Sequence, residues 1–358
     1  MATIPSIAMI PSGVKASKLY SVLPTDGTGD FTTTRASVAT RVNENGLIEE
    51  VAANVPRLDY SDGGCPSLLL EPTATNLVTY SEDFSNASWT KLGSTVVTSN
   101  TVISPDGTLN GSTVSGWSAS GDLNNNIAFN AADKTVTFSL YLKGSGTVRL
   151  QLSNSINDNI VIYFTLTANW KRYSLTKTFN ATASTNLLIN IDNSGATATE
   201  FNIYGAQLEE NSYATSYIKT VGTTQTRVAD TATGSGSSTV INSTEGVLYA
   251  EISALSNATS VRGISLSDGS SDNRVYIHFT SDTNIRTQVR VGGVNQVVIN
   301  STQTLTNLNK IAFVFKQDDF ALWINGVEVA IDTSGNTYSS NTLTVLSFDD
   351  GGGGNNFY

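Results

Sequence analysis

Short runs in which every second residue is apolar recur along this chain, with turn-forming residues between them. Clear examples are residues 136–142, 161–166 and 310–316. A period of two predicts strands that bury one face and expose the other, whereas a helix needs a period near 3.6. No part of the pattern requires a helix, so it predicts an all-β protein.

Turn signals indicate how these strands are connected. Asn325-Gly326 lies between two alternating runs and predicts a two-residue β-hairpin. Gly292-Gly293 predicts a second hairpin within residues 288–298. Many short strands joined by tight turns are typical of antiparallel sandwiches. The chain is therefore expected to form tandem antiparallel β-sandwiches.

The length of 358 residues exceeds one ordinary domain and allows two or three. Residues 1–74 are broken early by prolines and read as a short, irregular β-rich unit that needs packing partners for stability. Residues 75–222 and 240–358 carry the alternating strands of two sandwiches. Between them, residues 223–239 include a Gly/Ser-rich run and are expected to be a flexible linker.

Composition excludes several classes of function. Only 14% of residues are charged and the net charge is −10, which argues against nucleic acid as a partner, because phosphate binding needs clustered Lys or Arg. No apolar run approaches the roughly 18 residues of a membrane span, so no membrane insertion is expected. Cys65 is the single cysteine, which rules out an intrachain disulfide. The N-terminus lacks the pattern of a signal peptide.

Three segments resemble parts of known β-modules. Residues 205–220 with 226–230 resemble a segment that recurs in tailed-phage structural proteins, where it closes a jelly-roll module. Residues 76–89 resemble the opening strand of carbohydrate-binding jelly rolls. Residues 320–329 resemble the central hairpin of concanavalin A-like, or laminin G-like, sandwiches. The resemblance implies a jelly roll followed by a concanavalin A-like sandwich.

Together with residues 34–37 and 65–72, these segments resemble fibre, adhesin or decoration proteins of tailed phages. The resemblance implies a virion-surface protein, assembled in the host cytoplasm, that attaches to other virion proteins of capsid or tail through residues 1–74. It also implies a homotrimer and binding of host surface glycans for adsorption. Such proteins run on past a segment like 355–358, so the last sandwich is expected to lack its final strand, or to receive it from a partner.

Two other functions stay open, a capsid or tail protein without a ligand and a polysaccharide-degrading enzyme. A histidine-dependent triad would have to use His278, the single histidine, which lies in an alternating strand. Glycosidases of the concanavalin A-like fold share a Glu-x-Asp-x-x-Glu strand motif that this chain lacks. The adjacent pairs Glu49-Glu50 and Glu209-Glu210 point to opposite faces of a strand. We therefore expect no enzymatic activity and no catalytic residue.

Candidate ligand-binding residues are few. Trp117 lies in a Ser/Gly-rich stretch that would expose it, and it is the best single candidate for stacking on a sugar. Trp89, Trp170 and Trp323 lie in or beside strands and are expected in the core or at its rim. Oxygen-rich turns at Asp83, Asp268 and Asp272 could hold a structural Ca²⁺. We favour the simpler explanation that these aspartates cap their own turns, so no cofactor is expected.

Overall fold

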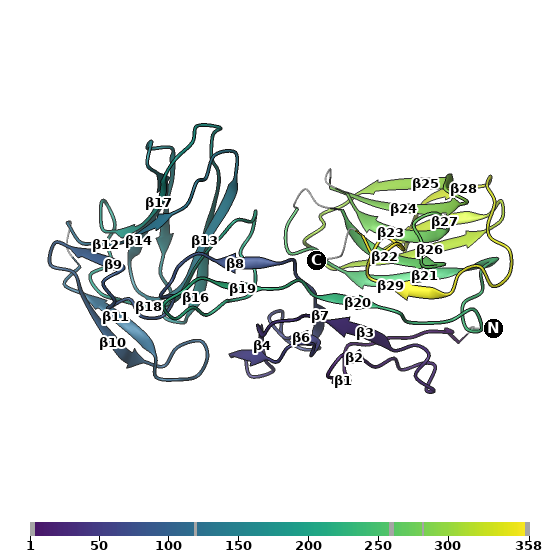
Figure 1. The fold of residues 1–358 in the computed structure, drawn as a ribbon, viewed down its shortest axis with the longest axis horizontal. Coiled ribbons are helices and arrows are strands. Elements are labelled where there is room, and N and C mark those ends of the chain that lie inside the picture. Colours follow the sequence, from purple (N-terminus) through teal and green to yellow (C-terminus); the bar gives the residue numbers. More distant parts are fainter. Residues whose placement is uncertain (1–3, 118–119, 258–260, 281–282, 355–358) are drawn as a thin grey trace.

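The computed structural model describes residues 4–117, 120–257, 261–280 and 283–354, and its regular elements in these ranges are all β-strands (Figure 1). Two β-sandwiches lie side by side, and the N-terminal unit runs along the second sandwich. The predicted all-β class and the tandem sandwiches are confirmed. The described part of the chain contains no helix that could cross a membrane.

Short strands make up the N-terminal unit. The first three form one sheet with a strand from later in the chain, β20 (Thr231–Thr233), in the order β1-β2-β3-β20, and β4–β5 and β6–β7 are separate hairpins. The strands are β1 (Val14–Lys15), β2 (Lys18–Leu19), β3 (Phe31–Thr34), β4 (Ala39–Val42), β5 (Ile48–Val51), β6 (Arg57–Asp59) and β7 (Ser67–Leu69). The sheet is completed by a strand about 200 residues away, so this unit depends on the rest of the chain.

The first sandwich has two five-stranded sheets, ordered β10-β11-β18-β13-β16 and β15-β14-β17-β12-β9. Consecutive strands from β11 to β14 alternate between the sheets, which is the connectivity of a jelly roll. The strands are β9 (Trp89–Leu92), β10 (Val96–Val102), β11 (Gly111–Ser115), β12 (Asp122–Ala128), β13 (Thr135–Gly144), β14 (Thr147–Asn154), β15 (Asn159–Thr165), β16 (Lys171–Thr178), β17 (Asn186–Asp192) and β18 (Phe201–Glu209).

The segment 223–239, expected to be a flexible linker, is instead built into the fold. Strand β19 (Gln225–Arg227) pairs with β8 (Ala74–Asn76), and β20 (Thr231–Thr233) pairs with β3. Ser235 is fully buried and donates a hydrogen bond to the Gly29 carbonyl at 2.7 Å. The linker prediction was wrong because small polar residues also suit a strand that packs closely against a neighbouring backbone. We call residues 223–239 the joint.

The second sandwich pairs a four-stranded sheet, β21-β26-β27-β28, with a five-stranded sheet, β25-β24-β23-β22-β29. Its strands are β21 (Glu245–Ile252), β22 (Arg262–Ser267), β23 (Arg274–Phe279), β24 (Asn284–Val291), β25 (Val294–Thr302), β26 (Asn309–Lys316), β27 (Phe320–Ile324), β28 (Val327–Asp332) and β29 (Val345–Ser347). Both predicted hairpins are present, β24–β25 and β27–β28. Asn325 and Gly326 have φ of 52° and 84°, as their turn requires.

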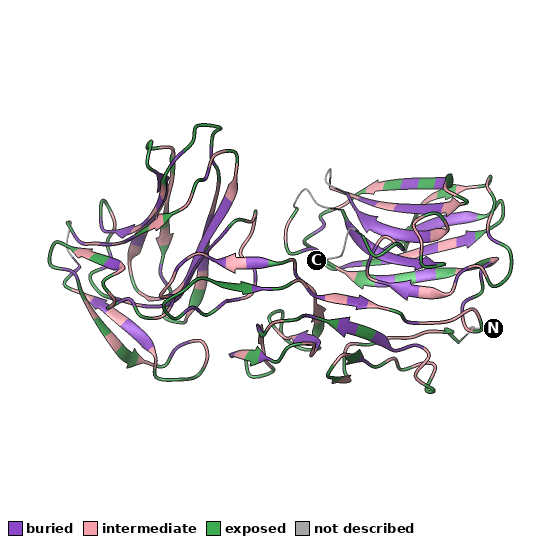
Figure 2. Cartoon of the chain, in the orientation of Figure 1, coloured by how far each residue is buried: buried purple, intermediate pink, exposed green. Residues whose placement is uncertain are grey.

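Buried residues form one large core in each sandwich (Figure 2). The core of the second sandwich continues into the N-terminal unit through Leu19, Phe31 and Leu58. The rings of Phe31 and Phe348, for example, lie 5.3 Å apart. A smaller cluster of Ile48, Tyr204 and Tyr217 packs hairpin β4–β5 against the jelly roll. The N-terminal unit is therefore anchored to both sandwiches.

Candidate functional site

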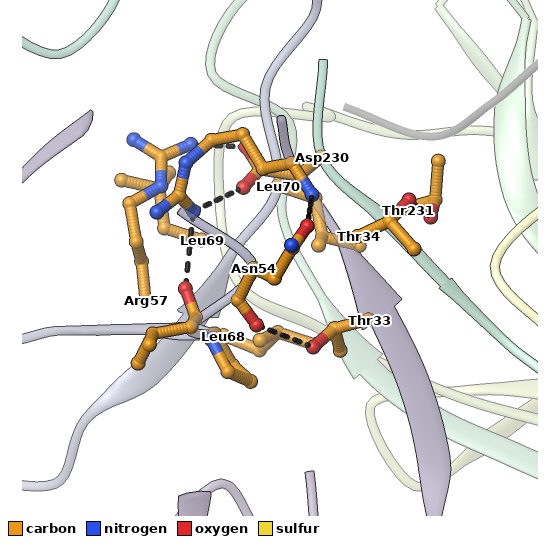
Figure 3. Close-up of a pocket in the computed structure, with 12 residues that line it drawn as sticks. Thr33, Thr34, Asn54, Arg57, Leu68, Leu69, Leu70, Asp230 and Thr231 are labelled. Atoms are coloured by element: carbon orange, nitrogen blue, oxygen red, sulfur yellow. Dashed lines mark hydrogen bonds and ion pairs between the residues drawn. The ribbon is translucent and has the colours of Figure 1, made fainter. Parts of the chain in front are cut away.

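Three arginines and two carboxylates are buried together where the N-terminal unit meets the joint. Two of them, Arg57 and Asp230, are labelled in Figure 3. We call this group the ion cluster. Its members come from five separate places in the chain and are 5% exposed or less: Arg35 after β3, Arg57 in β6, Glu71 after β7, Arg227 in β19 and Asp230 before β20. The cluster therefore ties the N-terminal unit to the joint.

Asp230 is one of the two acceptors at the centre of the ion cluster. Its carboxylate accepts a hydrogen bond from Arg35 Nη1 at 2.9 Å and a short one from Arg57 Nη2. It also accepts the backbone N–H of Glu71 at 3.0 Å. Arg35 donates further hydrogen bonds to backbone carbonyls, including that of Ala52 at 2.6 Å. Charge-assisted hydrogen bonds of this kind are the strong ones in proteins.

Glu71 is the second acceptor and joins the cluster to the jelly roll. It accepts from Arg57 Nη1 at 2.6 Å and lies 3.0 Å from Arg227 Nη1. It also accepts from the hydroxyl and the backbone N–H of Ser216, just after β18, at 2.6 and 2.7 Å. Burial alone would raise the pKa of this carboxyl, but the two arginines and Ser216 lower it to about 2. Glu71 is therefore ionised at neutral pH.

The space inside this region is too small for a ligand. The cavity lined by Arg35, Asn54, Arg57 and Asp230 measures about 10 Å³ (Figure 3), close to the minimum that one water molecule needs. The hydrogen-bonding capacity of the two carboxylates is also directed at protein groups. The ion cluster is a structural clamp, and a ligand site has to lie elsewhere.

A polar platform lies on the outer face of the jelly-roll sheet β15-β14-β17-β12-β9. Strand register places the amides of Gln151, Asn190 and Asn124 side by side on neighbouring strands. Residues two positions further along each strand lie on the same face, so a second row runs parallel to the first. That row consists of Arg149, Asp192 and Asp122. We call the first set the amide row and the second the charged row.

Hydrogen bonds hold both rows in place. Arg149 forms a short ion pair with Asp192 and donates to Gln151 Oε1 at 3.3 Å. Asn190 Nδ2 donates to Asp192 at 3.1 Å, and Asn124 Nδ2 donates to Asp122 at 3.4 Å. Burial and the neighbouring Asp192 carboxylate raise the pKa of Asp122, against the opposing effect of Asn124. The platform therefore presents side chains in fixed orientations, at the strand spacing of about 4.8 Å.

Groups able to bind a ligand remain on this platform. Gln151 Nε2 and Asn124 Oδ1 have no hydrogen-bond partner in the part of the chain that the structure describes. Tyr163 extends the charged row onto β15, opposite Arg149, and its side chain is 52% exposed. Its hydroxyl donates to the Ser194 carbonyl at 2.8 Å, which fixes the ring. Aligned amides beside an exposed aromatic ring suit a polyhydroxylated ligand, because amides both donate and accept.

Sequence reasoning missed this platform, although it placed the strands. The alternation within 148–152, 161–166 and 187–191 shows that each strand has a polar side. It does not show which polar residues become neighbours, because that depends on the register between strands far apart in sequence.

Trp117, the residue expected to stack on a sugar, is buried. Its side chain is only 4% exposed and meets Phe201 edge-on, with ring centroids 5.1 Å apart. The exposure expected from its polar neighbours was wrong, since the indole points into the core between the sheets. Trp89 is also fully buried, whereas Trp323 is 38% exposed on the second sandwich.

The three candidate calcium ligands lie in separate turns. Asp83 accepts from the backbone N–H groups of Ser85 and Asn86, and Asp268 accepts from that of Ser270 at 2.9 Å. Asp272 lies 3.8 Å from Arg290. The described residues contain no group of three or more His, Cys, Asp or Glu side chains placed to hold a metal. Calcium binding stays a prediction, and the hydrogen bonds of Asp83 and Asp268 are those of turn-capping residues.

His278 lies on the outer face of β23 and is 5% exposed. Its ring stacks on Tyr276 with centroids 4.2 Å apart, and Nδ1 has no partner among the described residues. Burial, together with Arg286 and Arg274, lowers the pKa of His278 to about 3. This histidine is therefore neutral at physiological pH, and among the described residues no carboxylate pairs with it to orient it as a catalytic base.

A larger cavity of about 150 Å³ separates hairpin β6–β7 from the second sandwich. Its walls are mainly aliphatic and aromatic, with Leu68 and Leu70 on one side and Ile252 and Phe279 on the other. Arg262 and Asp59 are also among the lining residues. The cavity marks loose packing between the two units.

Comparisons with known proteins identify no family. No protein-family model matches the chain, and no curated protein matches it. Solved structures do resemble it at low similarity. The enzymatically active domain of bacteriophage CBA120 tailspike protein 4 matches with a TM-score of 0.30 and 15% identity, covering 37% of this chain and 21% of that one. This chain therefore spans about a fifth of that protein.

Carbohydrate-binding modules are among the other structures. The tandem CBM22-1–CBM22-2 domain of Paenibacillus barcinonensis Xyn10C matches with a TM-score of 0.31 and 11% identity, covering 76% of this chain and 96% of that one. A family 16 carbohydrate-binding module matches with a TM-score of 0.28 and 14% identity, covering 37% and 97%. Similarity at this level says nothing about the ligand, and the assignment of β-sandwiches rests on the strand pairing described above.

Proposed function

We propose that this chain is a surface protein of a tailed-phage particle, of fibre or decoration type, that binds host glycans through the jelly-roll platform. The observation that carries the glycan proposal is the alignment of Gln151, Asn190 and Asn124 beside the exposed ring of Tyr163. The virion proposal is supported by the segments that resemble phage proteins. Four residues of the ion cluster, Arg35, Glu71, Arg227 and Asp230, come from those same segments.

The rigid joint supports this role. A protein that carries a receptor-binding module away from a particle transmits force and orientation through its connections. Here strands β19 and β20 of the joint pair with β8 and β3, and the buried ion pairs of the ion cluster hold the joint in place. In this proposal residues 1–74 attach to the particle and the sandwiches face outward. Display of many copies would turn weak sugar contacts into firm adsorption.

A glycan array probed with the full-length chain tests the binding. We expect binding to host surface glycans that Tyr163→Ala lowers at least tenfold and that the double change Gln151→Ala/Asn124→Ala abolishes. Tyr20→Ala, a change at a tyrosine that is 40% exposed on the N-terminal unit, is the matched control and should bind like the parent. Absence of binding to arrays and to whole host cells would favour a structural role without a ligand.

An enzymatic alternative is tested on the same ligands. Asp122 and Asp192 lie opposite each other, and a hydrolase would need such a pair. Asp192, however, is engaged by Arg149 and by the backbone N–H of Ser194 at 2.8 Å, so it is a poor nucleophile. We expect no release of reducing ends from a bound polysaccharide.

Gold labelling of the particle with an antibody against this chain tests the virion location.

A further inference from the structure

Apart from Glu328, the middle of the outer face of sheet β21-β26-β27-β28 is apolar, although it is exposed to solvent in the single chain. Ile331 is 62% exposed, Val247 58%, Tyr249 53% and Trp323 38%. Contiguous apolar patches of this kind on a soluble protein mark interaction sites. We call it the apolar face, and its residues are Val247, Tyr249, Ala312, Val314, Ala321, Trp323, Val329 and Ile331.

Strand register arranges the apolar face in two rows. One row is purely aliphatic and runs across all four strands: Val247, Val314, Ala321 and Ile331. The other row consists of Tyr249, Ala312 and Trp323 and ends on β28 at Glu328, the register partner of Trp323, with Val329 beside it in the bulge. The aliphatic row offers no hydrogen-bonding group, which argues against a sugar as the occupant of this face.

Charged residues border the rows at both ends. Glu245 and Lys316 lie at one end, 3.8 Å apart, and Glu251 and Lys310 at the other, also 3.8 Å apart. Asp319 is exposed at the start of β27, next to Lys316 in the turn, where its N–H donates to the Lys316 carbonyl. Both lysines are on β26 and both glutamates are on β21, so the charges are unevenly distributed across the face.

We infer that the apolar face binds the same face of a second copy of this chain, related by a two-fold axis that runs parallel to the strands between β26 and β27. This rotation reverses the strand order, so β26 of one copy lies over β27 of the other and β21 over β28. Positions along the strands are unchanged by the rotation, so each row faces the same row of the second copy, as an isologous interface requires.

Side-chain size is complementary in this arrangement. The indole of Trp323 lies over Ala312 of the second copy, the one residue in its row small enough to receive it. Tyr249 lies over Glu328 and Val329 of the second copy, and the aliphatic row packs against itself. Each contact occurs twice because of the two-fold symmetry. Aromatic groups that fill shallow pockets lined by small residues are typical of the centres of interfaces.

A two-fold axis in the plane of the interface could run parallel or perpendicular to the strands, and the charged residues decide between the two. With the axis parallel to the strands, Lys316 lies over Asp319 of the second copy. An axis perpendicular to the strands would place Glu245 over Glu251 of the second copy and Lys316 over Lys310. Like charges that face each other across an interface cost free energy. The arrangement parallel to the strands is therefore the favoured one.

The size of the face predicts a weak dimer. Strands β21 and β26 have eight residues each, and β27 and β28 have five and six. At about 3.4 Å per residue and about 4.8 Å between strands, they present roughly 440 Å² per copy. Two copies bury on the order of 900 Å², which is in the range of weak, transient interfaces. We expect a dissociation constant in the micromolar range, about 1–100 µM. On a particle, high local concentration would keep such a contact formed.

Sedimentation velocity of the full-length chain over about 1–200 µM tests this inference. We expect a shift from monomer to dimer, and Ile331→Lys should weaken association at least tenfold. Val294→Lys is the matched control, because Val294 is also 62% exposed but lies on the opposite sheet. A chain that stays monomeric, or an association that Ile331→Lys leaves unchanged, would overturn the inference. A trimer would also overturn it and would support the threefold assembly expected from the sequence.

Charge reversal tests the orientation separately. Lys316→Glu alone and Asp319→Lys alone should each weaken the dimer, because each places two like charges opposite one another. The combined variant should restore association close to that of the parent. Circular dichroism confirms that each variant is folded, which is expected since both side chains are exposed. If the combined variant fails to restore association, the two-fold axis parallel to the strands is wrong.

Discussion

Asp230→Ala is the sharpest test of the ion cluster as the clamp of this fold. The substitution removes an acceptor that binds Arg35, Arg57 and the Glu71 backbone N–H. Arg57 keeps Glu71 as a partner, but Arg35 loses its only carboxylate among the described residues while it stays about 2% exposed. Removing one member of a buried ion pair costs about 3–5 kcal/mol, because the remaining charge is left uncompensated.

Urea-induced unfolding of the full-length chain at pH 7 measures this loss. We expect the transition of the N-terminal unit and joint to lose about 3–5 kcal/mol of unfolding free energy. Asp272→Ala is the control, because that side chain is 63% exposed and lies 3.8 Å from Arg290, so its loss should be within about 0.5 kcal/mol. A loss below about 1 kcal/mol for Asp230→Ala would show that the cluster does not hold the joint together.

Three further predictions concern single groups. The pKa of Glu71 is lowered from 4.5 to about 2, so its ionised form stabilises the fold by about 3 kcal/mol. This stabilisation is complete above pH 4.5 and is lost as the pH falls towards 2. Glu71→Gln should therefore remove this part of the pH dependence of the unfolding free energy. Trp117→Ala should cost about 3–5 kcal/mol in thermal unfolding because the indole is buried, whereas a change near zero would mean that it is exposed. The imidazole NMR signal of His278, the single histidine, should not titrate between pH 5 and 8, because its pKa is lowered to about 3; a midpoint near 6.5 would contradict its burial.

Local pattern was enough to predict most of the strands. Alternation in 310–316 became β26, and Asn325-Gly326 became the turn of β27–β28 with both residues at positive φ. These predictions succeeded because a half-buried strand and a two-residue turn are each specified by residues that are neighbours in the sequence. The same reasoning failed for the joint, where small polar residues suited both a flexible linker and a strand packed closely against the N-terminal unit.

Site prediction failed where contacts join distant parts of the chain. Trp117 sits among Ser and Gly residues, and its burial depends on Phe201, 84 residues further on. Asp83 and Asp268 accept hydrogen bonds from backbone N–H groups of their own turns, an arrangement that sequence can indicate because those hydrogen bonds are local. The platform was missed because its amides become neighbours only when β14, β17 and β12 pair in one register.

The sequence by itself determined the all-β fold class of this protein, the strands within its sandwiches and the tight turns between them. It could do so because the alternation of apolar and polar residues and the preferences of turn residues act over only a few positions. Only the tertiary structure decided what these strands bring together. Asp230 and Arg35 are 195 positions apart, and their pairing exists because β20 returns to complete the sheet of β3. The amide row and the apolar face likewise follow from register between strands, which the side chains of the whole core select together.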